Sequence, residues 1–159
     1  MKIKFDKYTF WTIASLIGQC YGYPMDDVKE KSGYSEEEFE ALDKKVFEDP
    51  EGHIINFKDD PNITIEGSKQ AVKELTENLR EFNKEMSIDI SDFPIIIAGS
   101  KLAIKEMTEG FPDDGGDLLT IVDITKEQGL KLISLLESIQ EKAKNSNQIQ
   151  KSEITVEDW

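Results

Sequence analysis

The chain has 159 residues, 38% hydrophobic and 33% charged, which is enough apolar material for one folded domain with a core. Its 33 Asp and Glu residues outnumber 19 Lys and Arg residues, which gives a net charge of −14. A charge of this sign repels nucleic-acid phosphates and anionic lipid surfaces, and it attracts basic proteins. Composition therefore argues against a nucleic-acid-binding or membrane-surface protein, and favours a basic protein as the partner.

The start of the chain has one feature of a secretory signal, because Lys2, Lys4 and Lys7 precede the apolar residues 8–17. Asp6 interrupts the basic part, however, and no Ala-x-Ala-like cleavage site follows. No apolar run reaches the roughly 20 residues that a membrane span needs. A single cysteine allows no internal disulfide. We expect a cytoplasmic protein.

In the first half of the chain, two helices have clear sequence signals. Apolar residues recur every three or four positions over residues 8–20, which predicts an amphipathic helix. A second helix is expected after Ser35, because Ser35 and Glu38 have the spacing of a capping box. The elements expected next are two short strands and a third helix, at residues 53–57, 63–65 and 68–82.

In the second half, Met86, Ile88 and Ile90 alternate with polar residues, which predicts a half-buried strand. The continuous apolar run at 93–98 predicts a central strand covered on both faces. Ser100 is expected to cap a short helix that follows, and residues 118–124 are expected to form the last clear strand. A capping box of Thr125 and Gln128 then opens a long helix that runs to Lys144.

These elements predict an α+β fold with a mostly antiparallel or mixed sheet and amphipathic helices packed on one face. We expect residues 1–144 to form a single globular domain. Residues 145–159 are expected to be a polar C-terminal tail that could add an edge strand at 154–156.

Two segments could carry chemistry. Cys20 and His53 could pair as nucleophile and base, but Cys20 falls on an apolar helix face, where a thiol is usually a small buried hydrophobe. The sequence around Gly99, Ser100 and Lys101 could hold a phosphate at a helix N-terminus, but the full GxxxxGK[ST] pattern is missing. We expect no catalytic residue and no cofactor.

The acidic, glycine-rich segment 109–117 is the most distinctive part of the sequence. Its carboxylates could bind Ca²⁺ or Mg²⁺, yet the alternating Asp-x-Asp-x-Asp-Gly order of an EF-hand loop is absent, and we expect no metal. We expect the segment to present an apolar anchor within an acidic surface to a basic partner. The predicted partner-binding residues are Glu109, Phe111, Asp113, Asp114 and Asp117, then Asp59 and Asp60. Other acidic groups, such as Asp26-Asp27 and Glu36 to Glu38, are expected to be solvated surface.

The order of strand, cap and helix occurs twice, at residues 63–65 before Ser68 and at 120–122 before Thr125. In size, acidity and these units the chain resembles the small cytoplasmic immunity proteins that neutralise bacterial toxins. The resemblance implies an inhibitor that covers the active site of a basic toxin, such as a nuclease. Two alternatives are open: a structural or adaptor protein of a phage or another assembly, and an enzyme whose site is built from carboxylates with a metal.

Overall fold

The computed structural model describes residues 1–23, 25–47, 86–109, 116–145 and 153–159. The chain divides into two compact units, Met1–Phe47 with Met86–Trp159, and Glu48–Glu85. All of the described residues belong to the first unit. The elements expected at 53–57, 63–65 and 68–82 lie outside the described residues, and the division into residues 1–144 and 145–159 stays a prediction.

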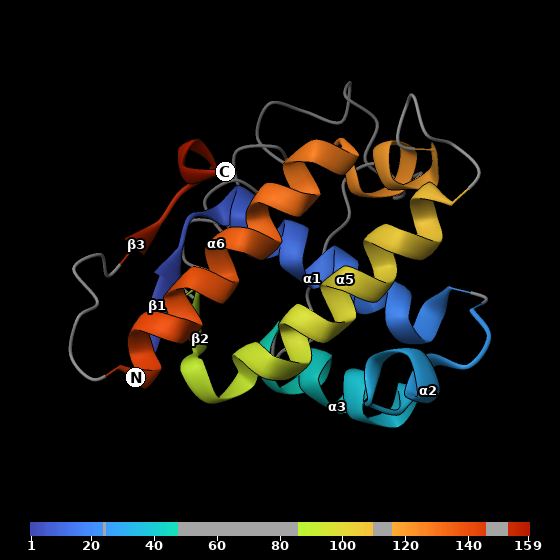
Figure 1. Ribbon diagram of the computed structural model, residues 1–159, viewed down its shortest axis with the longest axis horizontal. Coiled ribbons are helices and arrows are strands. Elements are labelled where there is room, and N and C mark those ends of the chain that lie inside the picture. Colours follow the sequence, from blue (N-terminus) through green and yellow to red (C-terminus); the bar gives the residue numbers. More distant parts are fainter. Residues whose placement is uncertain (24, 48–85, 110–115, 146–152) are drawn as a thin grey trace, which may run out of the picture. The chain divides into compact units, whose positions relative to one another are not determined.

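The described residues form an α+β fold in which helices dominate (Figure 1). None of these helices is both long and apolar enough to cross a membrane. The helices are α1 (Lys7–Gly22), α2 (Val28–Ser32), α3 (Glu36–Val46), α5 (Phe93–Thr108) and α6 (Lys126–Lys144), and the short helical turns are η1 (Ile90–Asp92), η2 (Leu118–Val122) and η3 (Val156–Asp158).

The sheet is mixed, which is one of the two expected arrangements, but it is small and helices dominate the fold. Its three strands are β1 (Lys2–Phe5), β2 (Ser87–Asp89) and β3 (Glu153–Ile154), in the order β2-β1-β3. The central strand β1 runs antiparallel to β2 and parallel to β3. Ile3 and Phe5 are buried while Lys2 and Lys4 are exposed, so one face of β1 packs on the core.

The core lies among four helices, with α5 packed against both α1 and α6, and α1 also against α3 (Figure 1). Three of these helices meet at Gly99 of α5. A Cβ atom built there would lie 2.6 Å from Cε1 of Phe39 and 2.9 Å from Cδ1 of Ile17. The absence of a side chain at Gly99 therefore allows α5 to approach α1 and α3 closely.

Three of the helices predicted from caps and periodicity are confirmed, at Lys7–Gly22, Glu36–Val46 and Lys126–Lys144. The capping boxes at Ser35 and Thr125 are both formed, since each N-cap hydroxyl accepts from the third residue of its helix and the side chain of that residue accepts in return. At the start of α1, the Asp6 carboxylate accepts a hydrogen bond from the Thr9 N–H. The predicted inward stripes are buried, as Phe10, Ile13 and Ile17 in α1, Phe39, Leu42 and Val46 in α3, and Leu132, Leu136 and Ile139 in α6.

The central strand predicted at 93–98 is wrong, because these residues begin helix α5. Pro94 occupies the first turn, where its missing N–H is not needed, and η1 leads directly into the helix. Ile96 and Ile97 are both buried between neighbouring helices, so the helix is apolar over most of its circumference. A helix of this kind has the same continuous apolar sequence as a buried strand.

Ser100 is therefore not an N-cap. It lies in the middle of α5, fully buried, with no hydrogen-bond partner for its hydroxyl. The phosphate interpretation required a helix N-terminus at this position, and the structure places the N-terminus at Phe93 instead. That interpretation is wrong.

The strand predicted at 118–124 is also wrong. Leu118–Val122 forms a single π-helical turn, and Asp123, in the left-handed conformation at φ 62°, connects the turn to the cap of α6. Leu118, Val122 and Ile124 are buried, whereas Leu119 and Ile121 are 40% and 49% exposed. This apolar alternation imitates a strand in the sequence.

Candidate protein-binding surfaces

The structure describes two of the seven predicted partner-binding residues. Glu109 is exposed at the end of α5. Asp117, at the start of η2, accepts a hydrogen bond of 2.5 Å from the Tyr23 hydroxyl, which raises the pKa of Tyr23. Asp117 is thus held against the end of α1. The remaining members, Phe111, Asp113, Asp114, Asp59 and Asp60, lie outside the described residues.

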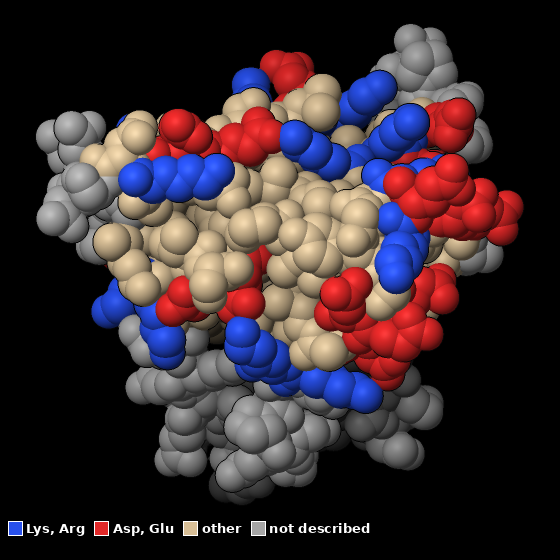
Figure 2. Space-filling model, turned by 60° about the horizontal axis from the view of Figure 1, so that its bottom comes forward, with Lys and Arg blue, Asp and Glu red and all other residues tan. Residues whose placement is uncertain are grey.

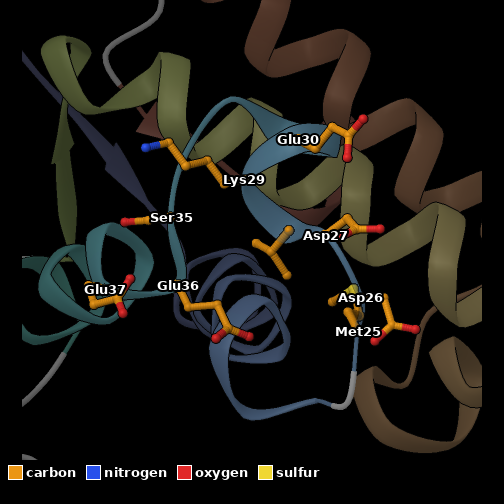
Figure 3. A pocket seen from close by; sticks show the side chains of 9 residues that line it. Met25, Asp26, Asp27, Lys29, Glu30, Ser35, Glu36 and Glu37 are labelled. Carbon is orange, nitrogen blue, oxygen red and sulfur yellow. The ribbon is translucent and has the colours of Figure 1, made fainter.

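A second acidic surface surrounds an open depression of about 700 Å³ between α2 and the start of α3. Asp26, Asp27 and Glu30 come from the α2 segment, and Glu36 and Glu37 from the first turn of α3 (Figure 3). Lys29 is the one basic residue among the lining side chains. We call this hollow, with the five carboxylates that line it, the acidic depression.

Local backbone geometry places the two segments beside each other. Asp27 and Gly33 flank α2 in the left-handed conformation, at φ 57° and 85°, so the chain turns sharply before and after this short helix. Val28 is buried, and Lys31 forms an ion pair of 2.9 Å with Glu106 of α5, which together hold α2 against the core.

Electrostatics explain why the acids of the depression are tolerated in one place. Glu36 and Glu37 lie at the N-terminus of α3, where the helix dipole favours negative charge. All five side chains are exposed, so water screens their repulsion. Within the described part of the chain, no group of three or more His, Cys, Asp or Glu residues is arranged to hold a metal ion. The acidic depression is therefore a concentration of solvent-facing negative charge.

On the face shown in Figure 2, carboxylates likewise gather toward one side, with lysines between them, next to an area without charged side chains.

A different surface is apolar and runs over the start of α1. A groove of about 420 Å³ is lined by Tyr8, Trp11 and Val122, with Lys7, Thr12 and Ser15. A depression of about 680 Å³ is lined by Leu130, Leu135 and Trp159, with polar neighbours. Tyr8 lines the first hollow and Trp159 the second, and their rings stack with centroids 5.9 Å apart. We call Tyr8, Trp11, Leu130 and Trp159 the aromatic strip.

Hydrogen bonds to α1 hold the C-terminal residues in this surface, near the start of α1 in Figure 1. The Asp6 carboxylate accepts from the N–H groups of Thr9 and Val156, both at 2.7 Å. The Trp159 indole N–H donates to the Thr9 hydroxyl at 3.1 Å. Burial raises the pKa of Asp6, but the hydrogen bonds from Thr9 and Val156 outweigh it, and the pKa is lowered.

Exposed large apolar side chains occur in the strip, at Tyr8 and Leu130, and in the two turns next to it. The large hydrophobic residues that are exposed in the described ranges are Met1, Tyr8, Leu119, Ile121, Leu130 and Val156. All except Met1 belong to the strip or to the turns η2 and η3 that adjoin it. Scattered exposed hydrophobic residues need no explanation, but a contiguous group marks a contact surface.

Cys20 is buried, and its thiol donates to the backbone carbonyls of Gly99 at 3.3 Å and Leu16 at 3.6 Å. Burial raises the pKa of the thiol to about 12, so the reactive thiolate is scarce at neutral pH. His53 lies outside the described residues. The geometry around Cys20 is that of a structural thiol in the helix core.

The chain matches no protein-family model, and no curated protein or solved structure shows significant similarity to it. The surfaces above therefore stand on their own geometry, and the resemblance to immunity proteins stays a prediction.

Proposed function

We propose that this protein is a binding inhibitor of the immunity type, which acts in the cytoplasm and neutralises a basic toxin by covering its active site. The observation that carries the proposal is the acidic depression, where five exposed carboxylates and one lysine line a hollow that is open to solvent, in a chain of net charge −14. The negative charge of this hollow is complementary to a cationic surface of a partner.

The proposed mechanism is electrostatic attraction followed by steric occlusion. An enzyme that cleaves nucleic acid has a cationic active site, because it must hold phosphates. Carboxylates on an inhibitor bind to the same cationic groups. Their long-range electrostatic field also raises the association rate, by about 10- to 1,000-fold over a neutral pair at low salt. Since the side chains of the acidic depression are exposed, we expect them to contribute more to the rate of association than to the final affinity.

The direct test is capture of the partner from the native host on the immobilised protein, with washes at low and then high salt. We expect one stoichiometric basic protein that is released by salt, and whose enzymatic or toxic activity falls as the inhibitor is titrated. Capture of no protein at either salt concentration would contradict the proposal. So would a captured partner that keeps full activity in the complex.

A matched pair of variants separates local charge from total charge. One variant carries Asp26→Asn, Glu30→Gln and Glu37→Gln in the acidic depression. The control carries Glu40→Gln, Glu137→Gln and Glu141→Gln, which change the net charge equally at other positions of α3 and α6. We expect slower association with the captured partner for the first variant only, since local charges act most strongly on the docking step.

The aromatic strip favours a second candidate function, that of a structural or adaptor protein which joins an assembly through apolar contacts. Such contacts weaken little with salt, because they depend on buried apolar area rather than on charge. This candidate would be supported over the inhibitor by a complex or self-association that is insensitive to salt. The same complex should form equally well with the variant that carries Asp26→Asn, Glu30→Gln and Glu37→Gln.

A further inference from the structure

We infer that the aromatic strip is the docking site for a basic amphipathic helix of the partner protein. The inference rests on the proposed function, and it specifies which kind of segment the partner contributes. It is carried by two features of the strip: an apolar hollow linked by stacked rings to a second hollow of mixed lining, and the carboxylates in and beside that second hollow.

The apolar part has the form of a groove that accepts anchor side chains. Tyr8, Trp11 and Val122 line the first hollow, of about 420 Å³, and Leu130, Leu135 and Trp159 line part of the second, of about 680 Å³. The stacked Tyr8 and Trp159 rings link them, since one ring lines each hollow. Two hollows joined by a ring stack suit a segment that places apolar residues on one face and charged residues beside them, as an amphipathic helix does when it docks in a groove.

The aromatic rings also have fixed orientations in the unbound chain. The Tyr8 hydroxyl donates to the backbone carbonyl of Asp123 at 3.2 Å, and the Trp159 indole N–H donates to Thr9. Side chains held in this way lose little conformational freedom when a partner binds. Amphipathic rings with the polar atom satisfied and the apolar face exposed are typical of binding surfaces.

The edges of the strip are acidic. Three exposed carboxylates lie beside it. They belong to Asp123, directly after η2, to Glu127 in the first turn of α6, and to Glu157 in η3. The hydrogen bond from the Tyr8 hydroxyl to the Asp123 carbonyl places Asp123 beside the aromatic surface, and burial together with the negative charge of Asp123 raises the pKa of Tyr8. Lys131 forms an ion pair with Glu127 at 3.2 Å, and Lys7 lines the first hollow, so these lysines offset part of the charge. In a chain of net charge −14, an apolar segment flanked by lysine or arginine is the favoured occupant.

The chain provides its own reporter for this site. It contains two tryptophans, Trp11 and Trp159, and both belong to the strip. A helix that docks here removes water from the indole rings, and we expect their fluorescence emission to shift to shorter wavelength. Binding can therefore be measured on the full chain without a label.

The first experiment titrates the full chain with a synthetic peptide of Leu and Lys whose leucines lie at the spacing of one helix face. We expect a saturable blue shift of tryptophan emission, and an affinity that falls at least about tenfold between salt at about 10 mM and about 150 mM. Two control peptides have Glu in place of Lys, or the same Leu and Lys residues in strict alternation. The inference is overturned if the helical Leu–Lys peptide causes no shift, or if either control binds as tightly.

The second experiment locates the binding. Leu130→Gln keeps the helix propensity of α6 and removes an anchor contact, and we expect it to weaken peptide binding about tenfold. Asp123→Asn removes a rim charge at a position whose left-handed backbone suits Asn, and we expect it to reduce the salt dependence. Glu141→Gln, near the far end of α6, is the control and should bind as the unmodified chain does. Circular dichroism of each variant establishes that it is folded.

The captured partner separates failure of this inference from failure of the proposed function. If a basic protein is captured and inhibited, but binds Leu130→Gln as tightly as the unmodified chain, the docking site is wrong and the inhibitor proposal stands. If no basic protein is captured, the inhibitor proposal fails, and the inference that rests on it fails as well, whatever the peptide titration gives.

Discussion

Replacement of Gly99 by alanine tests the packing of the helix core, because three helices meet at this glycine. The new Cβ would lie 2.6 Å from Cε1 of Phe39, 2.9 Å from Cδ1 of Ile17 and 3.2 Å from Sγ of Cys20. The Ile17 methyl is the end of a flexible side chain and can move. The Phe39 ring is fully buried, so it has little room to shift. The substitution must therefore strain α3 or push α5 outward.

Two terms of opposite sign decide the magnitude. Alanine is favoured over glycine in a helix interior by about 1 kcal/mol. Overpacking of a dense core costs about 1–3 kcal/mol. We expect Gly99→Ala to lower the free energy of unfolding by about 1 kcal/mol, which is the difference between about 2 kcal/mol of strain and the gain in helix propensity.

Gly18→Ala is the matched control, since Gly18 lies within α1 and a Cβ there meets nothing within 4 Å. We expect this variant to raise the free energy of unfolding by about 0.5–1 kcal/mol. The assay is urea unfolding followed by circular dichroism, in which a change of midpoint at constant slope reports stability. If Gly99→Ala stabilised the protein as much as Gly18→Ala, α5 would not pack closely on α1 and α3, and the reasoning would be refuted.

Three further predictions concern other parts of the fold. Asp6→Ala should lower the free energy of unfolding by about 1 kcal/mol through loss of the N-cap of α1. The folded pKa of Asp6 lies below its ordinary value of 3.8, so its contribution to the free energy of unfolding is complete above pH 3.8 and is lost as the pH falls through the folded pKa. The stability of Asp6→Ala should therefore depend less on pH in that range than the stability of the unmodified chain. Cys20 should resist a thiol reagent at neutral pH in the native protein and react after unfolding, whereas rapid native labelling would contradict its burial. Gly33→Ala should cost about 1 kcal/mol in urea unfolding because of the left-handed backbone at φ 85°, and Gly33→Asn should cost less. Equal stability of Gly33→Ala and the unmodified chain would show that the backbone there is not left-handed.

Local sequence signals predicted the helices that have strong caps. Ser35 with Glu38, and Thr125 with Gln128, form their capping boxes from residues three positions apart, which requires no knowledge of the rest of the fold. Residues 93–98 and 118–124 were assigned to strands because their apolar patterns fit a buried or alternating strand. Residues 93–98 begin α5 and Leu118–Val122 forms a helical turn, and both pack against neighbouring helices. Pro94 in the first turn of α5 was the signal that could have identified this helix.

The candidate surfaces were harder to predict, since they depend on tertiary contacts. The acidic depression joins Asp26 and Asp27 to Glu36 and Glu37 through the turns on either side of α2, and each group alone reads as solvated surface. The strip brings Trp159 to α1, where its indole binds Thr9, 150 positions earlier in the chain. Neither periodicity nor caps contain information on such a contact. The acidic segment 109–117 was predicted as a partner-binding site from its composition alone. Composition does not reveal that Asp117 accepts a hydrogen bond from the Tyr23 hydroxyl.

The central claim is that negative charge at the acidic depression brings a basic partner to this chain. Its most direct measurement is the rate constant for association with the captured partner, at salt concentrations of about 10 mM and about 150 mM, where the screening length falls from about 30 Å to about 8 Å. We expect the rate to fall at least about tenfold with added salt. The variant with Asp26→Asn, Glu30→Gln and Glu37→Gln should be slower at low salt than the control with Glu40→Gln, Glu137→Gln and Glu141→Gln. A rate that does not change with salt, or that is equal in these two variants, would contradict the claim.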